Sequence, residues 1–258
     1  MDERTDGRAA RERRYWDEAY RAEGLHHEKY LWCQAVAADS QGHALFASLL
    51  ADLSGKRVLT IGGGIDTVGL MLAKNDNRVL SADISPVAVR QTRLLARRSG
   101  VGKNLSAVVM NCEQMEFENE FDVVVCKGAL HHMNLAKAVE GVRRSLTVGG
   151  RFFAEEPVCL LRPLRWVHEK FPFHPNAPRT ADEVELASAD LALIESAFGE
   201  TEFHYIDFLT RESVKHFVWK ARAGRWLRPL GRLDFSLLNH YLPPLRYLST
   251  YVVIRATK

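Results

Sequence analysis

Short apolar runs alternate with stretches of helical periodicity through the middle of the chain. Strands are predicted at 57–61, 78–82, 105–110 and 121–126, and a fifth begins at 151–154. Helices are predicted between them: one through Lys74, one from Ser85-Pro86 to about Ser99, and one over 135–146. Such alternation is typical of a parallel sheet with helices on both faces. We therefore predict a doubly wound α/β fold with a mostly parallel sheet of about seven strands.

Both ends of the chain predict helical additions to this sheet. Residues 15–52 have a helical pattern with aromatic side chains, and a second helix is expected within them at 43–53. After the proline-rich stretch 157–180, we expect a helix at 181–197, a strand at 202–208, helical material at 211–242 and a last strand at 251–256. We see no linker that would separate domains, so 1–258 is expected to form a single domain.

Composition narrows the class of protein. Hydrophobic residues make up 47% and charged residues 26%, as in ordinary globular proteins. A net charge of +3 does not predict nucleic-acid binding. No apolar run approaches the about 20 residues of a membrane span, and the N-terminus is polar, so we expect a cytoplasmic protein without stable membrane insertion. The four cysteines form no C-x-x-C pair and are expected to be reduced thiols.

A glycine-rich turn follows the first predicted strand. Gly62, Gly63 and Gly64 have no side chains to block a ligand, and Asp83 ends the next strand 19 residues after Gly64. An acid at that distance can hold ribose hydroxyls, so the pattern predicts a nucleoside-containing cofactor at the carboxyl edge of the sheet. The alternative is a tight turn with no ligand. Thr67 stands where a dinucleotide loop has its third glycine, which disfavours a nicotinamide cofactor.

Five segments in the same order resemble the motifs of class I S-adenosylmethionine-dependent methyltransferases. They are VLTIGGGID (58–66), VLSADISP (79–86), NCEQMEFENEFD (111–122), VVVCKGALHH (123–132) and RRSLTVGGRFFAEEP (143–157). The resemblance implies a Rossmann-like fold, S-adenosylmethionine as the cofactor and S-adenosylhomocysteine as its product. It also implies that 55–158 is the cofactor-binding core, 1–54 a helical lid, and 159–258 the acceptor side.

The resemblance places the cofactor on particular residues. Asp83, followed by Ile84, would bind the ribose, and Asn111 and Cys112 would contact the adenine. The glycines Gly62, Gly63 and Gly64 would form the loop beneath the cofactor. Apart from the resemblance, Lys127 in the loop after the fourth strand is a candidate to face the cofactor's carboxylate, and an ordinary surface lysine is the alternative.

Two positions depart from the family pattern. The usual acid at the end of the first strand is Thr60 here, and the last glycine of the loop is Asp66. A hydroxyl is a weaker partner for a cation than a carboxylate is. We hypothesise that Asp66 supplies the missing negative charge for the cofactor's ammonium group. The alternative is that the fold was kept and the donor chemistry lost.

Candidate catalytic residues follow the fourth strand. His131 and His132 stand where the family places residues near the transferable methyl, and a histidine suits proton removal at neutral pH. The alternative is that they cap a helix or pack under the loop. No metal is expected, because Cys126-Lys127-Gly128-Ala129 replaces the paired acids of metal-using relatives.

Other segments keep several interpretations open. Trp16 and Tyr20, with His26 and His27, predict either an aromatic lid that holds the sulfonium by cation–π contact or an amphipathic helix with core aromatics. The basic segment 211–232 predicts an acceptor lid, contact with an anionic membrane surface, or a solvated helix face. Three further residues are candidates for an acceptor pocket: Glu156, His168 and His174.

The function expected is methyl transfer from S-adenosylmethionine to an oxygen or nitrogen atom of a small molecule, in specialised metabolism by analogy only. The rivals are a methyltransferase-fold enzyme with another reaction, such as cyclisation, and a non-catalytic methyltransferase-like subunit. The expected partner is a small-molecule acceptor and not a nucleic acid, and a homodimer stays open.

Overall fold

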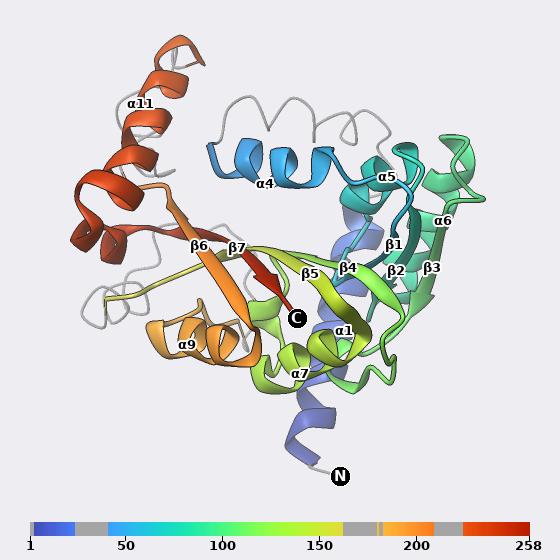
Figure 1. Ribbon diagram of the computed structural model, residues 1–258. Helices are drawn as coiled ribbons and strands as arrows, with labels where there is room; N and C mark the ends of the chain where they lie inside the picture. Colours follow the sequence, from blue (N-terminus) through green and yellow to red (C-terminus); the bar gives the residue numbers. More distant parts are fainter. Residues whose placement is uncertain (1–2, 24–40, 162–179, 181–182, 209–223) are drawn as a thin grey trace.

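A seven-stranded, mostly parallel sheet forms the centre of the protein (Figure 1). The computed structural model describes residues 3–23, 41–161, 180, 183–208 and 224–258. The strands are β1 (Arg57–Ile61), β2 (Arg78–Asp83), β3 (Leu105–Val109), β4 (Phe121–Lys127), β5 (Leu146–Pro157), β6 (Glu200–Ile206) and β7 (Tyr251–Thr257). Their order is β3-β2-β1-β4-β5-β7-β6, and β7 runs antiparallel to both of its neighbours. This confirms the predicted fold class.

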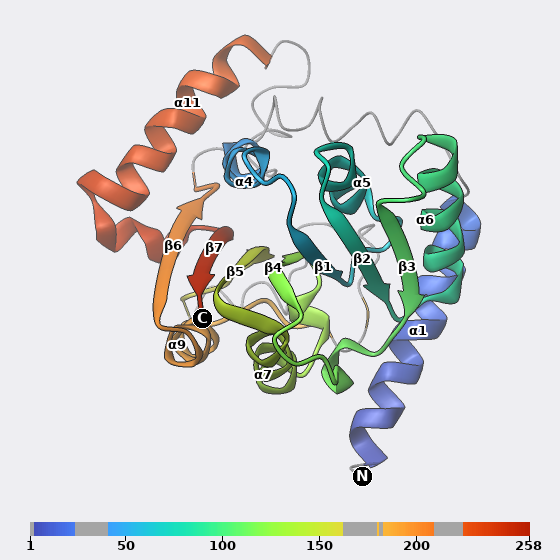
Figure 2. The same cartoon turned by 45° about the vertical axis from the view of Figure 1, so that its right-hand side comes forward.

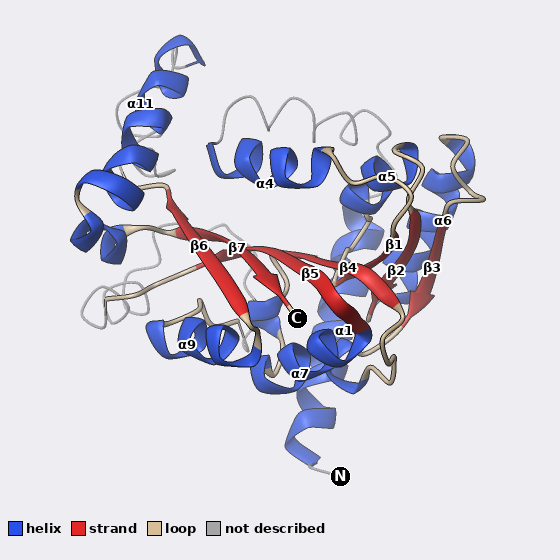
Figure 3. Cartoon of the chain, viewed as in Figure 1, coloured by secondary structure: helices blue, strands red, loops and turns tan. Residues whose placement is uncertain are grey.

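Helices cover both faces of this sheet (Figures 2 and 3). One face carries α4 (Gln41–Ala51), α5 (Thr67–Lys74) and α6 (Pro86–Arg98), and the opposite face carries α7 (Leu135–Ser145) and α9 (Ser188–Ala197). Helix α1 (Glu3–Glu23) runs beside α6, and α11 (Gly224–Ser236) precedes the last strand, β7. Short helical turns cover Cys112–Gln114, Leu130–His132, Leu237–Tyr241 and Pro243–Leu248.

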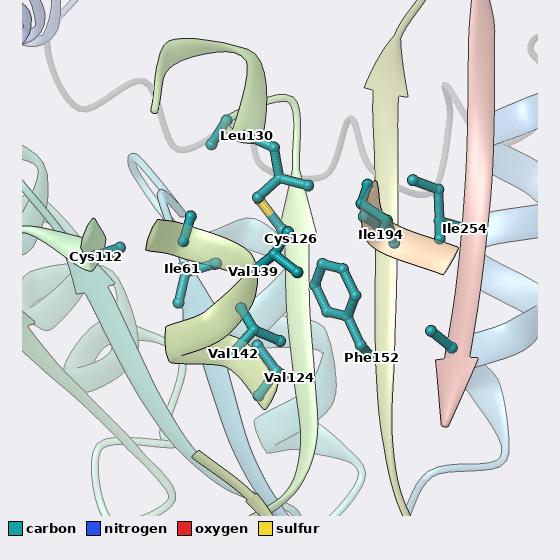
Figure 4. Close-up of a cluster of buried hydrophobic side chains, with 14 of the residues drawn as sticks. Ile61, Cys112, Val124, Cys126, Leu130, Val139, Val142, Phe152, Ile194 and Ile254 are labelled. Atoms are coloured by element: carbon teal, nitrogen blue, oxygen red, sulfur yellow. The ribbon is translucent and has the colours of Figure 1, made fainter. Parts of the chain in front are cut away.

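Strand β4 shows how the sequence divides the core in two. Its side chains alternate between the faces because successive residues of a strand point in opposite directions. Val123 and Val125 pack in the cluster beneath α4, α5 and α6, whereas Val124 and Cys126 pack in the cluster beneath α7 and α9. Figure 4 shows the second cluster, with Phe152 at its centre. A continuous apolar run is therefore what a strand buried on both faces requires.

Most predicted elements lie within a few residues of the observed ones, but the helix expected at 181–197 was wrong in its start. It begins at Ser188, and 181–182 lie outside the described residues. Leu186 pairs with the chain after β5 instead: its N–H donates to Pro157 O, and its carbonyl accepts from Cys159 N. These bonds hold the backbone extended, so the helix cannot begin there.

The fifth strand also begins earlier than predicted, at Leu146, and therefore includes the turn at Gly149-Gly150. Of the predicted helical range 211–242, residues 224–241 are helical in the structure, as α11 and the turn Leu237–Tyr241. Residues 211–223 lie outside the described residues. None of the helices that the structure describes has the length and apolar character that crossing a membrane requires.

Candidate cofactor and acceptor site

A cavity opens where the carboxyl ends of four parallel strands meet. Its volume is about 770 Å³, including the part open to solvent. Strand order reverses at β1 and β4, and ligands of doubly wound folds bind at such a switch point. The lining residues come from the strand ends, the loops after them and helix α1: Ala9, Glu12, Trp16, Tyr20, Gly62, Gly63, Asp83, Ile84, Met110, Asn111, Cys112, Glu113, Lys127, Gly128, Ala129, His132 and Met133. The structure therefore brings most of the predicted site residues together.

The glycine turn after β1 forms the floor of this cavity. Gly62 and Gly64 have φ values of +60° and +58°, a conformation that residues with a Cβ rarely adopt. A Cβ on Gly62 would overlap Ala129, and a Cβ on Gly64 would overlap the Tyr20 hydroxyl. The turn therefore requires glycine both for its backbone conformation and for the close approach of its neighbours.

Asp83 lies at the cavity wall at the end of β2. Its carboxylate accepts hydrogen bonds from Gly64 N at 2.8 Å and from Ser85 N at 2.8 Å, which ties the glycine turn to the start of α6. Burial raises the pKa of Asp83 to about 6, although these two backbone bonds oppose the shift. Carboxylate oxygens have further lone pairs, so Asp83 can still accept from ligand hydroxyls.

Thr60 and Asp66 lie next to each other behind the glycine turn, outside the lining of the large cavity. The Thr60 hydroxyl donates to Asp66 Oδ2, and Gly69 N donates to Asp66 Oδ1 at 2.6 Å. Burial raises the pKa of Asp66, against these hydrogen bonds. Both residues border a smaller hollow that Gly63 and Lys127 also line. Lys127 lines the two hollows and lies 3.5 Å from Glu155 Oε2.

The wall after β3 carries Asn111 and Cys112. Asn111 caps a helical turn by accepting from Glu113 N at 3.1 Å, and Cys112 is buried below it. Burial raises the pKa of Cys112 to about 12, so its thiol is neutral and apolar in character. Ile84 and Cys112 therefore give this part of the cavity lining an apolar surface, and Asn111 gives it an amide group.

A buried carboxylate organises the loop after β4. Glu156 Oε1 accepts from Ala129 N at 3.0 Å and from Leu130 N at 2.9 Å, and Glu156 Oε2 lies 2.7 Å from His131 Nδ1. Burial would raise the pKa of Glu156, but its bond to His131 and the His131 charge outweigh burial and lower it. Burial would lower the pKa of His131, and Glu156 reverses that shift and raises it. Glu156 therefore fixes the loop and does not line the described cavity.

His132 is the member of the histidine pair that faces the cavity. Its ring lies 4.1 Å from the His131 ring and meets Trp16 edge-on at 5.4 Å. Its Nδ1 lies 3.4 Å from Glu12 Oε2 and 3.3 Å from Thr180 Oγ1. Ligating atoms of His131, His132 and Glu183 also lie within 4.8 Å of one another.

Helix α1 closes one side of the cavity through several contacts with the core. Arg8 pairs with Glu113, the Ser85 hydroxyl donates to Asp17, and Gln91 Nε2 donates to the Tyr20 carbonyl at 3.0 Å. Trp16 stacks on Tyr20 with ring centroids 5.5 Å apart. The aromatic positions expected in a lid therefore lie over the cavity.

Glu12 and Glu113 are the charged lining residues that sequence reasoning did not name as site residues. The resemblance contained no signal for Glu12, because that carboxylate reaches the cavity only through the docking of α1. Glu113 directly follows the predicted adenine-contacting pair, so its position was within reach. The candidates His26, His27, His168 and His174 lie outside the described residues.

Comparison with known proteins finds similarities in the middle of the chain. A family profile described as "Methyltransferase domain" matches residues 59–154. The chain is 32% identical over 115 residues to the ubiquinone/menaquinone biosynthesis C-methyltransferase UbiE of Zymomonas mobilis, a match that covers 43% of this chain and 46% of the relative. It is 29% identical over 142 residues to UbiE of Yersinia pestis, covering 51% of this chain and 57% of that protein. The chain thus spans about half the length of these curated relatives.

Solved structures share the fold over more of the chain. Geranyl diphosphate C-methyltransferase from Streptomyces coelicolor, solved with Mg²⁺, geranyl diphosphate and S-adenosyl-L-homocysteine, matches with a TM-score of 0.58 at 17% identity, covering 83% of this chain and 78% of that one. The [4+2]-cyclase SpnF matches with a TM-score of 0.58 at 18% identity, covering 83% and 79%. At such identities the likeness is one of fold, which serves different reactions.

Proposed function

We propose that this chain, whose residues 59–154 belong to the class I S-adenosylmethionine-dependent methyltransferase family, transfers a methyl group from S-adenosylmethionine to a small molecule. The observation that carries the proposal is the placement of Asp83. Its carboxylate accepts a hydrogen bond from the glycine turn and borders the cavity at the carboxyl ends of the parallel strands, where ligands of doubly wound folds bind.

The cavity residues fit the parts of the cofactor. Asp83 would hold the ribose hydroxyls, and Asn111 and Cys112 with Ile84 would contact the adenine. Lys127 would face the cofactor's carboxylate at the boundary of the two hollows. Gly62 and Gly63 line the cavity, and the missing Cβ atoms of Gly62 and Gly64 let Ala129 and Tyr20 approach the turn.

The ammonium end of the cofactor would lie towards Thr60 and Asp66. An Asp66 carboxylate bonded to the Thr60 hydroxyl puts a negative charge beside the position that normally bears the acid. Burial raises the pKa of Asp66, and an ammonium group nearby would favour its ionised form.

The bound cofactor supplies a methyl group that its sulfonium sulfur already activates. The protein has to align an acceptor with that methyl, exclude water and accept a proton where the acceptor has one to lose. Trp16 and Tyr20 offer aromatic faces to a cation on the α1 side. His132 lines the same cavity, and His131 lies behind it on Glu156, so His132 is our candidate base and His131 its support.

The remaining assignments extend this proposal to the whole chain. The single domain would divide into an N-terminal lid (1–54), a cofactor core (55–158) and an acceptor side (159–258). We propose a small-molecule acceptor and no nucleic-acid partner, consistent with the net charge of +3. The curated relatives are named C-methyltransferases. We therefore add carbon to oxygen and nitrogen as acceptor atoms to be tested.

The test is a turnover assay with methyl-labelled S-adenosylmethionine and a panel of small hydroxylated and amino compounds. S-adenosylhomocysteine should form in equal amount to a labelled product, and His132→Ala should slow both by about 100-fold or more. Product formation without S-adenosylhomocysteine would replace methyl transfer by another reaction, such as cyclisation. Cofactor binding without turnover across a broad panel would favour a non-catalytic subunit.

A further inference from the structure

The wall of the cavity on the α1 side carries a carboxylate that no strand motif accounts for. Glu12 projects from the middle of α1 and is 5% exposed. Its Oε2 accepts from Trp16 Nε1 at 3.0 Å and lies 3.4 Å from His132 Nδ1. Its Oε1 is buried and accepts no hydrogen bond within the described part of the chain. A buried carboxylate with spare acceptor capacity beside a histidine needs a partner.

The electrostatics of Glu12 agree with that partnership. Burial by itself would raise the pKa of Glu12, but hydrogen bonds with His132, Thr180 and Trp16, together with the His132 charge, outweigh burial and lower it. Glu12 is therefore ionised at neutral pH and acts only as a hydrogen-bond acceptor.

The geometry at His132 then separates its two ring nitrogens. Nδ1 faces Glu12 and Thr180, whereas Nε2 forms no hydrogen bond among the described residues. An acceptor at Nδ1 favours the tautomer that carries its proton there, which leaves the lone pair on Nε2. His132 lines the cavity, so this lone pair is available to a ligand.

We propose that Glu12 is a positioning residue that holds His132 as the Nδ1–H tautomer, and that the acceptor of the methyl group is a hydroxylated molecule whose proton passes to His132 Nε2. This inference rests on the proposed function for its reaction. Its structural part, the tautomer set by Glu12, stands independently of it. The same logic operates wherever a carboxylate orients a catalytic imidazole.

The proton and electron balance follows from this assignment. The acceptor's O–H bond breaks and its proton moves to His132 Nε2. An electron pair of the resulting oxyanion forms the new bond to the methyl carbon. The S–CH₃ bond breaks and its electron pair returns to sulfur, which becomes a neutral thioether. The imidazolium formed at His132 is paired with the Glu12 carboxylate.

The surroundings of His132 include other groups that compete for this role. Thr180 Oγ1 is as close to His132 Nδ1 as Glu12 Oε2 is, and the His131 ring from the same turn lies against the His132 ring at a tilt of 42°. Glu183 lies 3.9 Å from His131 Nε2 and completes a cluster of possible metal ligands with the two histidines. The experiment must therefore distinguish the effect of Glu12 on the His132 tautomer from the effect of Thr180. It must also distinguish a hydrogen bond at His132 from ligation of a metal ion by His132.

The experiment reads the tautomer directly, in the full-length protein with ¹⁵N-labelled histidine. Long-range ¹H–¹⁵N spectra report which ring nitrogen of His132 carries the proton, and His132→Gln assigns the signal. The wild type should be mainly the Nδ1–H tautomer at a pH where the ring is neutral. A hydrogen bond to a charged group is stronger than one between neutral groups, so Glu12→Ala should lower the preference for the Nδ1–H tautomer by about tenfold or more. Glu12→Gln, which keeps an acceptor oxygen, should restore part of that preference. The exposed Glu18 on the same helix provides the control, and Glu18→Ala should leave the spectrum unchanged.

Several results would overturn the inference. They are an Nε2–H tautomer in the wild type, an unchanged spectrum in Glu12→Ala, or a change in Thr180→Val alone. A joint shift of the His131 and His132 signals on adding one equivalent of Zn²⁺, abolished in Glu183→Gln, would also overturn it by making His132 a metal ligand. Calorimetry with S-adenosylhomocysteine on the same samples tests the proposed function separately, because it measures cofactor binding and not the tautomer of His132. Loss of that binding with the tautomer preserved would contradict the function and leave the role of Glu12 in place.

Discussion

The Asp66 carboxylate accepts a hydrogen bond from the Thr60 hydroxyl six residues earlier in the chain. The same carboxylate caps α5 by accepting from Gly69 N. The two departures from the family motif are therefore in direct contact. The hydroxyl at the end of β1 thus lies against a carboxylate that follows the glycine turn.

We predict that Asp66→Asn separates the charge of this group from its capping role. Asparagine caps helices as well as aspartate does, so the free energy of unfolding should change little through the cap itself. Loss of the negative charge should weaken S-adenosylhomocysteine binding by about tenfold, since the ammonium group loses a charged partner. Isothermal calorimetry checks the affinity, and chemical denaturation checks the fold. An unchanged affinity would remove Asp66 from the cofactor site.

Gly64→Ala is predicted to disturb the packing of α1 over the cavity. The new methyl group would overlap the Tyr20 hydroxyl, and it would also strain a backbone with a φ of +58°. Gly100→Ala is the matched control, because Gly100 has a φ of +74° and nothing lies within 4 Å of its added Cβ. Both variants should lose about 1–2 kcal/mol from backbone strain, but only Gly64→Ala should also lose cofactor affinity. Equal effects on binding would show that Tyr20 does not close the site.

Glu156→Gln should destabilise the protein more than any exposed charge substitution. The change leaves His131 without its charged partner in a buried site and disturbs the bonds to two loop N–H groups. Breaking a buried pair on one side costs about 3–5 kcal/mol. Urea denaturation at pH 7 measures the loss, with Glu200→Gln as an exposed control. A loss below about 1 kcal/mol would mean that Glu156 does not hold the loop.

Cofactor affinity should depend on pH through Asp83. Its pKa is raised to about 6, mainly by burial, and ribose hydroxyls donate to the ionised carboxylate. The carboxylate is ionised above pH 6, so affinity should be constant above about pH 7 and fall by up to tenfold per pH unit below 6. Calorimetry between pH 5 and 8 measures the profile. Asp83→Asn should flatten it, and a wild-type profile that stays flat to pH 5 would contradict this assignment.

The fold was largely predictable because its central strands β1 and β4 are buried on both faces. The run Val123-Val124-Val125 has no polar position, as a central parallel strand requires. Strand β1 begins at the exposed Arg57 and ends at Ile61, directly before the glycine turn. The start of α9 was not predictable in the same way. Leu186 is held by backbone bonds to Pro157 and Cys159, which are contacts between segments that no local pattern encodes.

The site was predictable only where its residues follow strands. Gly62, Asp83 and Asn111 each come directly after a predicted strand, so topology brings them to one edge of the sheet. Glu12 comes from a helix whose docking depends on pairs such as Arg8 with Glu113. The choice between His131 and His132 likewise depends on Glu156, which is 25 residues from His131 in sequence.

Calorimetric titration of the purified protein with S-adenosylhomocysteine, after removal of any bound ligand, tests the central claim most directly. We predict one site per chain with micromolar affinity in the wild type, and affinity at least about tenfold weaker in Asp83→Ala because the ribose loses a charged acceptor. The exposed Asp76→Ala serves as a control and should bind as the wild type does. Absence of binding in a folded wild-type protein, or equal affinity in the wild type and Asp83→Ala, would contradict the account.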